Sequence, residues 1–290
     1  MKSSLVKLHI AVFLWGFTGV IGRLITLNEG LLVWYRMLIT IISLYILIKW
    51  KGEVQRISFR LMMKLIGTGM LISLHWVFFY GSIKYSNVSI ALTCLSSAGL
   101  FTAILEPLIR GRRINSIEIL LGLIAIAGIY LIFHFDSRYR VGIIIGVVAS
   151  ILSVLFSIMN KDLVVKNITS RSLLLYEMVG GFFFLTLVMP FYLYLFPTKQ
   201  LLPSFPDWGW LLLMSWICTI MAMDLSLQAL RKVSVFTQNL TLNLEPVYGI
   251  LLAFIVYKEN KYLSQWFYYG FALIFLAVLL QTFRIVKNRK

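Results

Sequence analysis

The chain has 290 residues, of which 60% are hydrophobic and only 13% are charged, and its formal net charge is +16. About a quarter of the residues of a soluble domain are charged, so this composition excludes a soluble globular protein and indicates an integral membrane protein. The basic residues lie almost entirely between apolar segments, and no DNA- or RNA-binding motif accompanies them. We therefore attribute the charge to membrane topology and expect no nucleic-acid partner.

Ten apolar segments are long enough for membrane-spanning helices, since about 20 residues cross the ~30 Å hydrocarbon core. They are Lys7–Leu24, Leu31–Lys49, Lys64–Ile83, Val88–Ile109, Ile117–Phe133, Val141–Asn160, Leu173–Phe196, Trp208–Leu230, Val235–Tyr257 and Tyr262–Phe283. The first segment comes after a short basic start, and no small-residue cleavage pattern follows it. We therefore expect it to be retained as a span. The pattern predicts an all-α integral membrane protein with ten transmembrane helices.

Lysine and arginine are unequally divided between the two sides of such a bundle. Ten crossings place both termini on one side, whose segments hold 19 of these residues, whereas the opposite side holds 7. Positively charged loops stay in the cytoplasm. We therefore predict a multi-pass protein of the cytoplasmic (inner) membrane with both termini cytoplasmic.

The two halves of the chain also repeat. The stretch from Tyr80 to Ala91 aligns with the stretch from Leu227 to Gln238 at an offset of 147 residues. Each half has five spans, an odd number, so the second half enters the membrane from the opposite face. We predict a first five-helix repeat over residues 1–135 and an inverted second repeat over residues 136–290, an architecture common in secondary transporters.

The most unusual span lies between Ser234 and Glu259. Its first half holds an unusual set of polar side chains: Gln238, Asn239, Thr241, Asn243 and Glu245. A carboxylate near the membrane centre costs several kcal/mol and is rarely kept without a function. Pro246 follows it directly and loosens the helix by removing a backbone hydrogen bond. The sequence therefore predicts a substrate- or proton-binding site centred on Glu245.

Polar and aromatic residues at helical spacing on other spans extend this predicted site: Trp15, His75, Phe79, Ser96, Ser153, Ser157, Asn160 and Asp224. Small polar stripes are also typical of helix packing, and His75 could be a neutral histidine bonded to a neighbouring helix. Gly99 aligns with Pro246 across the repeat, so we predict both as hinges. A lone histidine without further ligands at suitable spacing is no metal site, and we expect no metal and no cofactor.

Four other charged residues have simpler interpretations. Arg36 and Glu177 lie about two turns inside their spans, and we expect their side chains to reach the membrane interface. Glu106 lies four residues before Arg110 near the end of the fourth span, a spacing that favours an ion pair. The two cysteines, Cys94 and Cys218, lie within apolar segments and are interpreted as reduced packing residues.

Four short motifs lie at regular places in this pattern: Leu14-Trp15-Gly16, Tyr35-Arg36, the run from Leu244 to Gly249, and Tyr257-Lys258-Glu259. With the order of the spans, they resemble the EamA-type branch of the drug/metabolite transporter superfamily. The resemblance implies spans 1, 3, 4, 6, 8 and 9 around a central cavity, with the others more peripheral. It departs from the family pattern at Gly111-Arg112-Arg113, where the fourth span usually ends in Gly-Glu.

Together these features predict a secondary transporter, a permease or exporter that moves small organic metabolites such as amino acids by alternating access, with proton coupling as an option. A channel and a non-transporting membrane sensor remain alternatives. An intramembrane enzyme is disfavoured because no nucleophile elbow frames the serines, and the chain has no phosphate-binding loop of a primary pump.

The expected partners are a small-molecule substrate and the lipid bilayer. Gly122, Ala125 and Gly128 on the fifth span permit close helix contact. That contact could lie inside one monomer or between the subunits of a homodimer.

Overall fold

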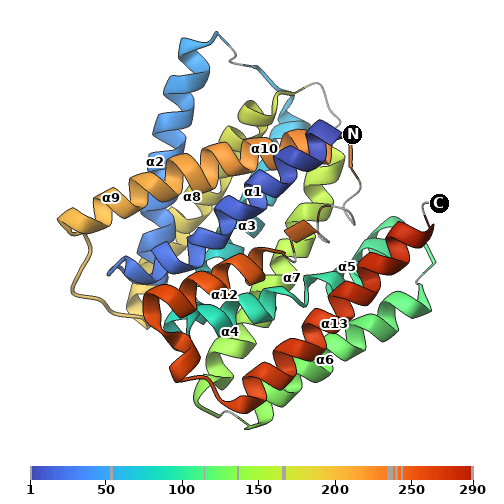
Figure 1. The fold of residues 1–290 in the computed structure, drawn as a ribbon. Coiled ribbons are helices and arrows are strands. Elements are labelled where there is room, and N and C mark those ends of the chain that lie inside the picture. The colour runs from blue at the N-terminus through green and yellow to red at the C-terminus, as the bar shows by residue number, and fades with distance from the viewer. Residues whose placement is uncertain are drawn as a thin grey trace.

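The computed structural model describes residues 2–52, 55–113, 115–135, 137–164, 168–233, 238, 241–242 and 244–288. The described residues form helices and connecting turns, without a strand among them (Figure 1). The helices of the first half are α1 (Lys2–Leu24), α2 (Glu29–Trp50), α3 (Phe59–Tyr85), α4 (Val88–Leu95), α5 (Ala98–Arg110) and α6 (Ser116–Phe135). Those of the second half are η1 (Ser137–Tyr139), α7 (Arg140–Leu163), α8 (Ser170–Leu195), α9 (Phe205–Leu213), η2 (Met214–Met221), α10 (Ala222–Leu230), α12 (Leu244–Tyr257), η3 (Glu259–Lys261) and α13 (Gln265–Asn288).

Seven helical segments in the described ranges are long and apolar enough to cross a membrane: Ser3–Leu24, Glu29–Trp50, Phe59–Tyr85, Val88–Arg110, Ser137–Leu163, Ser170–Leu195 and Phe205–Leu230. Three shorter apolar helices accompany them: Ile119–His134, Leu244–Tyr257 and Gln265–Ala277. The chain is therefore a multi-pass membrane protein. The first half of the expected span Val235–Tyr257 lies largely outside the described residues.

Two of the expected spans are irregular near their centres. The fourth breaks at Ser96 and Ser97, where α4 ends and α5 begins. The eighth is continuous, but its middle part, η2, is a π-helix. π-helical turns leave backbone carbonyls differently placed from those of an α-helix and are frequent at functional sites.

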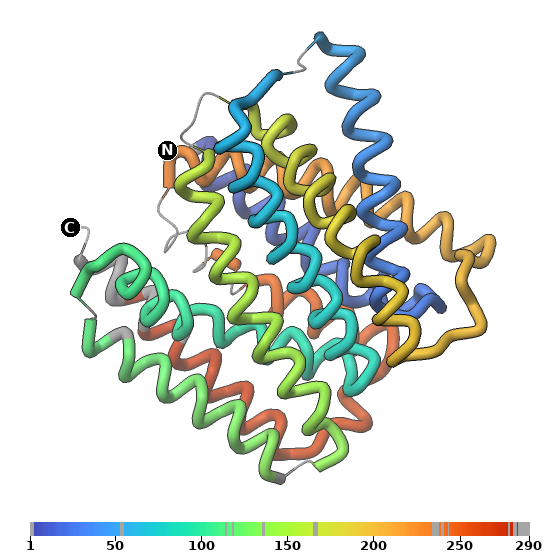
Figure 2. The backbone as a smooth tube through the Cα atoms, turned by 180° about the vertical axis from the view of Figure 1, so that it is seen from behind, coloured from blue at the N-terminus to red at the C-terminus, as the bar shows by residue number. Residues whose placement is uncertain are grey.

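The helices pack in pairs that correspond between the halves. α3 packs on α7 as α10 packs on α1, and α5 packs on α7 as α12 packs on α1. The pairs α2–α8 and α6–α13 join equivalent helices of the two halves. This is the pattern that a twofold relation between two repeated units produces. α6 and α13 lie side by side at one edge of the bundle, and α1 starts at the end of the bundle where α13 finishes (Figures 1 and 2).

The small residues of the fifth span make their contact inside the chain. A Cβ atom at Gly128 would collide with the backbone of Gly270, and one at Gly270 would collide with Gly128. The two glycines therefore let α6 and α13 touch backbone to backbone. Of the two contacts that the sequence left open for Gly128, the structure contains the one within the monomer.

A second close approach joins α3 to α8 at Gly69. A Cβ atom there would collide with the backbone carbonyl of Glu177, whereas one at Gly67 would meet nothing within 4 Å. We expect Gly69→Ala to lower the free energy of unfolding by about 1–3 kcal/mol, because the two helices must move apart. The matched change Gly67→Ala should cause no loss and gain up to about 1 kcal/mol from helix propensity. Thermal unfolding of both variants in detergent measures the difference, and equal melting temperatures would contradict this packing.

The predicted ion pair near the end of the fourth span is confirmed. Nε of Arg110 lies 3.3 Å from Oε1 of Glu106, and Nη2 of Arg110 lies 3.0 Å from Oδ1 of Asp162. Cys94 and Cys218 are both free and buried, as expected for packing residues.

Candidate functional site

A cavity of about 110 Å³ lies between the two halves of the chain. It is lined by Trp15, Thr18, Arg36, His75, Trp76, Phe79, Tyr80, Leu95, Ala98, Ser153, Phe156, Ser157, Asn160, Met223, Ser226, Leu227, Gln238, Leu242, Glu245 and Pro246. These residues come from α1 to α5 in the first half, and from α7, α10, α12 and the described residues before α12 in the second. Apart from Arg36 on α2, they lie on the spans that the family resemblance places around a central cavity.

One wall of the cavity is aromatic and is held by a backbone hydrogen bond. The ring of His75 stacks on Phe79 at 6.2 Å between centroids and contacts Phe156 at 5.4 Å. Nδ1 of His75 lies 2.8 Å from the carbonyl oxygen of Ala149 on α7. A carbonyl can only accept, so Nδ1 carries the proton and a neutral ring leaves Nε2 free to accept. His75 is thus bonded to a neighbouring helix and also lines the cavity.

The π-helix η2 supplies two groups that hold cavity side chains in place. The carbonyl of Cys218 accepts a hydrogen bond from Nε1 of Trp15 at 2.9 Å. The hydroxyl of Thr219 accepts one from Nε of Arg36 at 2.9 Å and donates its own to the carbonyl of Met214 at 3.0 Å. The irregular turn in the eighth span therefore fixes one aromatic and one basic residue of the cavity wall.

Arg36 is enclosed in the bundle, so the expectation that it reaches the membrane interface was wrong. Only 2% of its surface is exposed. Its guanidinium carbon lies 3.9 Å above the ring of Trp76, and Nη1 donates to the hydroxyl of Tyr80 at 2.5 Å. A side chain reaches the interface only where a path is open, and α3 and η2 close that path around Arg36.

Glu177 also differs from the expectation. It is fully buried on α8, and its carboxyl group lies within interaction distance of the Asn160 side chain without a well-aligned hydrogen bond. The backbone contact between α8 and Gly69 of α3 encloses this position and keeps the side chain from the membrane interface.

Glu245 brings an acid into the same cavity from the first turn of α12. Its side chain is half-buried and borders the cavity. None of the ion pairs among the described residues includes it. Nearby on the lining, Nε2 of Gln238 donates to the hydroxyl of Ser226 at 3.0 Å. A carboxyl group without a fixed partner can bind a cationic substrate group or a proton.

The structure brings nine of the predicted site residues to the cavity: Trp15, His75, Phe79, Ser153, Ser157, Asn160, Gln238, Glu245 and Pro246. It places four elsewhere: Ser96, Gly99, Asp224 and Thr241. Asn239 and Asn243 lie outside the described residues.

Asp224 makes contacts that connect helices rather than line the cavity. It accepts a hydrogen bond from Ser170 and pairs with Nε of Arg171 at 3.2 Å, which ties the start of α8 to α10. The hydroxyl of Ser96 donates a hydrogen bond to the carbonyl of Leu92 at the end of α4. For these residues the geometry supplies a structural contact and leaves the predicted binding role without support.

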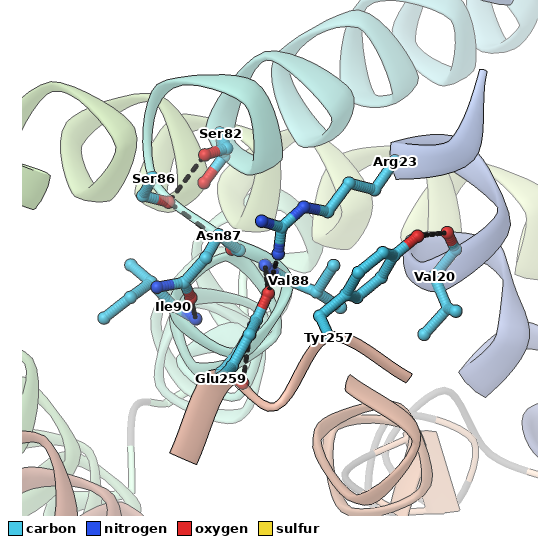
Figure 3. A network of polar contacts seen from close by, with 10 residues as sticks. Val20, Arg23, Ser82, Ser86, Asn87, Val88, Ile90, Tyr257 and Glu259 are labelled. Carbon is cyan, nitrogen blue, oxygen red and sulfur yellow. Dashed lines mark hydrogen bonds and ion pairs between the residues drawn. The ribbon is translucent and has the colours of Figure 1, made fainter. Parts of the chain in front are cut away.

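A network of polar contacts closes the bundle at the end where α1 and α12 finish and α4 begins (Figure 3). The carboxylate of Glu259, which is 3% exposed, accepts from the backbone N–H groups of Val88 at 3.1 Å and Ser89 at 2.9 Å, and from the Ser89 hydroxyl at 2.5 Å. It also pairs with Arg23 of α1. The side chain of Asn87 accepts from the next N–H, that of Ile90. Backbone donors of the first turn of α4 that have no partner inside the helix are thereby satisfied.

The same network holds the end of α12 on α1. The guanidinium of Arg23 lies 4.3 Å from the centre of the Tyr257 ring, and the Tyr257 hydroxyl donates to the carbonyl of Val20 at 2.7 Å. Lys258 turns the chain with a φ of 54°, a left-handed conformation, and Glu259 follows it directly. We call Arg23, Val88, Ser89, Tyr257 and Glu259 the α1–α4–α12 clamp.

Several of these residues were not singled out as site residues from the sequence. Arg36 and Glu259 did stand in the motifs Tyr35-Arg36 and Tyr257-Lys258-Glu259, which were the available signal. For Thr219 the only signal was a hydroxyl within an apolar span.

Comparisons with known proteins agree with the two-unit packing. A family model described as the EamA-like transporter family matches residues 3–134 and, a second time, residues 140–283. A solved structure described only as "Crystal structure of protein" superposes with a TM-score of 0.68 and 14% sequence identity, over 97% of this chain and 98% of its own. At that identity the likeness shows the fold alone. No curated protein matches the sequence.

Proposed function

This chain belongs to the EamA-like transporter family, and from that premise we propose that it is a secondary transporter of small organic solutes, such as amino acids, that works by alternating access. The observation that carries the proposal is the cavity between the halves, which both halves line with polar and aromatic side chains. Substrate sites of repeat-built transporters lie at such an interface.

The proposed architecture follows from the same premise. Residues 1–135 and 136–290 form two five-helix units of opposite orientation, ten spans in all, with both termini in the cytoplasm. In this orientation the α1–α4–α12 clamp lies on the outer side of the membrane. Asn160, Ser226 and Gln238, toward the cytoplasmic ends of their spans, then extend the cavity toward the inner side.

In this proposal the clamp acts as the outer gate. Between the cavity and the clamp, α1, α4 and α12 pack directly on one another. Rocking of one unit against the other would have to separate Glu259 from the start of α4 and from Arg23. The closed clamp then corresponds to a transporter that does not admit solute from outside.

Glu245 is the proposed centre of coupling or substrate binding. Its carboxyl group can carry a proton across or bind an amino group of the substrate. Either role needs an acid that borders the cavity without a permanent ion-pair partner, and Glu245 meets both conditions among the described residues.

Solute counterflow tests the proposal. Proteoliposomes preloaded with an unlabelled amino acid should accumulate the labelled one transiently, and the initial rate should saturate with external concentration, because each solute must occupy one cavity. A channel gives a rate that rises linearly with concentration and shows no overshoot. A panel of small amino acids and nucleosides supplies the solutes, and protein-free liposomes supply the background.

A further inference from the structure

We propose that Arg36 binds the carboxylate group of the solute in the cavity and thereby sets the specificity of the protein for compact carboxylate-bearing solutes. This inference rests on the proposed function, in that the cavity is taken to be the solute site. Four features of the site support it: the donors of the guanidinium, its charge, its rigidity and the size of the space in front of it.

The guanidinium of Arg36 has donors left over. It carries five N–H groups, of which Nε donates to Thr219 and Nη1 donates to Tyr80. Among the described residues no group accepts a hydrogen bond from Nη2, and this atom is not completely buried. Since Arg36 lines the cavity, its unused donors are available to a molecule inside it.

The charge of Arg36 has no fixed counter-ion in the described part of the chain. None of the ion pairs found there includes Arg36, although Glu245 lies near enough to interact electrostatically. The described residues that line the cavity include no other lysine or arginine. A buried charge without a partner is strongly unfavourable, so an anionic solute group would stabilise it.

The surroundings of Arg36 keep the guanidinium in one orientation. Thr219 and Tyr80 hold two of its nitrogens and Trp76 lies against its face. A fixed planar fork matches the two oxygens of a carboxylate, which a lysine ammonium does not. A phosphate would present the same oxygens with more charge than the single cation of the described lining can balance.

The space in front of Arg36 is small. A cavity of about 110 Å³ is less than the ~150 Å³ that accepts benzene in an engineered protein. Glu245 stands in the same cavity, so a small zwitterion would meet an acid and a base together. The matched probes are therefore alanine, alaninamide, which lacks the carboxylate, and propionate, which lacks the ammonium; phenylalanine tests size.

Equilibrium binding to the purified full-length protein, followed by calorimetry and by the intrinsic fluorescence of its eight tryptophans, tests the inference. Two of these tryptophans, Trp15 and Trp76, line the cavity. The wild type should bind alanine at least tenfold more tightly than alaninamide, because a site built for a charged group rejects an analogue without it. Arg36→Gln should abolish this ratio and Arg36→Lys should retain only part of it. Arg60→Gln removes an exposed arginine at the start of α3 and should leave the ratio unchanged.

A positioning variant keeps the test valid if Arg36→Gln does not fold. Thr219→Val leaves the charge of Arg36 in place and removes the acceptor for Nε, and it should reduce the ratio about threefold to tenfold. Equal binding of alanine and alaninamide by the wild type, a ratio that survives Arg36→Gln in folded protein, or no carboxylate-dependent binding across the panel would each overturn the proposal.

Binding and transport fail separately in this design. Carboxylate-dependent binding that Arg36→Gln abolishes, without counterflow, leaves the role of Arg36 standing and removes the proposed transport. Saturable counterflow of solutes with and without a carboxylate, unchanged by Arg36→Gln, retains transport and overturns the role of Arg36.

Discussion

Replacing Glu245 by glutamine is expected to reduce counterflow of the transported solute at least tenfold while leaving the amount of folded protein unchanged. Glutamine keeps the shape of the side chain but can neither carry the charge nor release a proton. A hydrogen bond to a charged group contributes about 1.5–3 kcal/mol, which corresponds to roughly a tenfold to a hundredfold change in affinity. No ion pair of Glu245 exists among the described residues, so folding should tolerate the change.

Glu106→Gln is the matched control for this experiment. Glu106 is also a half-buried glutamate on a span of the bundle, but it pairs with Arg110 and does not line the cavity. Initial rates of counterflow should be measured for both variants at several external pH values. If Glu245→Gln transports at the wild-type rate and with the wild-type pH dependence, Glu245 has neither the substrate-binding nor the proton-coupling role.

The course of the fold could be read from the sequence because hydrocarbon imposes a simple rule. A segment must satisfy its backbone internally to cross the membrane, so apolar length alone predicts the helices. The expected span Val141–Asn160 corresponds to α7, Arg140–Leu163, and the expected span Leu173–Phe196 corresponds to α8, Ser170–Leu195. Irregularities inside the spans have a different cause. The π-helix η2 is stabilised by contacts to Trp15 and Arg36, partners remote in sequence that no local pattern indicates.

The candidate site was partly predictable for a related reason. Polar side chains in apolar spans are costly, so those that occur tend to face a cavity or one another; this logic selected Glu245 and Asn160, which the structure places on the lining. It misplaced Arg36, because distance from a helix end says nothing about what packs around a side chain. It also missed Glu259, whose hydrogen-bond partner Ser89 lies 170 positions earlier in the chain.

Replacing Glu259 by alanine is expected to destabilise the protein by about 2–5 kcal/mol, because each buried donor left without an acceptor costs about 1–3 kcal/mol. The change leaves the N–H groups of Val88 and Ser89 without acceptors in a place where both residues are fully buried. It also removes the counter-ion of Arg23. Asp162→Ala is the matched control, because its carboxylate pairs with Arg110 while the side chain is 64% exposed; that change should alter stability by at most about 1 kcal/mol.

The same variant decides whether the α1–α4–α12 clamp is a gate. A cysteine at Thr18, a buried residue of the cavity lining, reports access from outside through its reaction with a membrane-impermeant maleimide. Cys94 and Cys218 are buried and should react slowly in the background. If the clamp closes the outer side, Glu259→Ala should raise the labelling rate of Thr18→Cys severalfold, and Asp162→Ala should not.

The melting temperature and the labelling rate together distinguish a gate from a strut, meaning a contact that only stabilises the fold. A strut holds helices in one arrangement, so its loss lowers the melting temperature without changing which side of the membrane reaches the cavity. A gate contributes to only one of two arrangements, so its loss shifts the population between them as well. A lower melting temperature with unchanged labelling would therefore make Glu259 a strut. The movement that opens the cavity to the outside would then have to occur at contacts other than those between Glu259 and the start of α4.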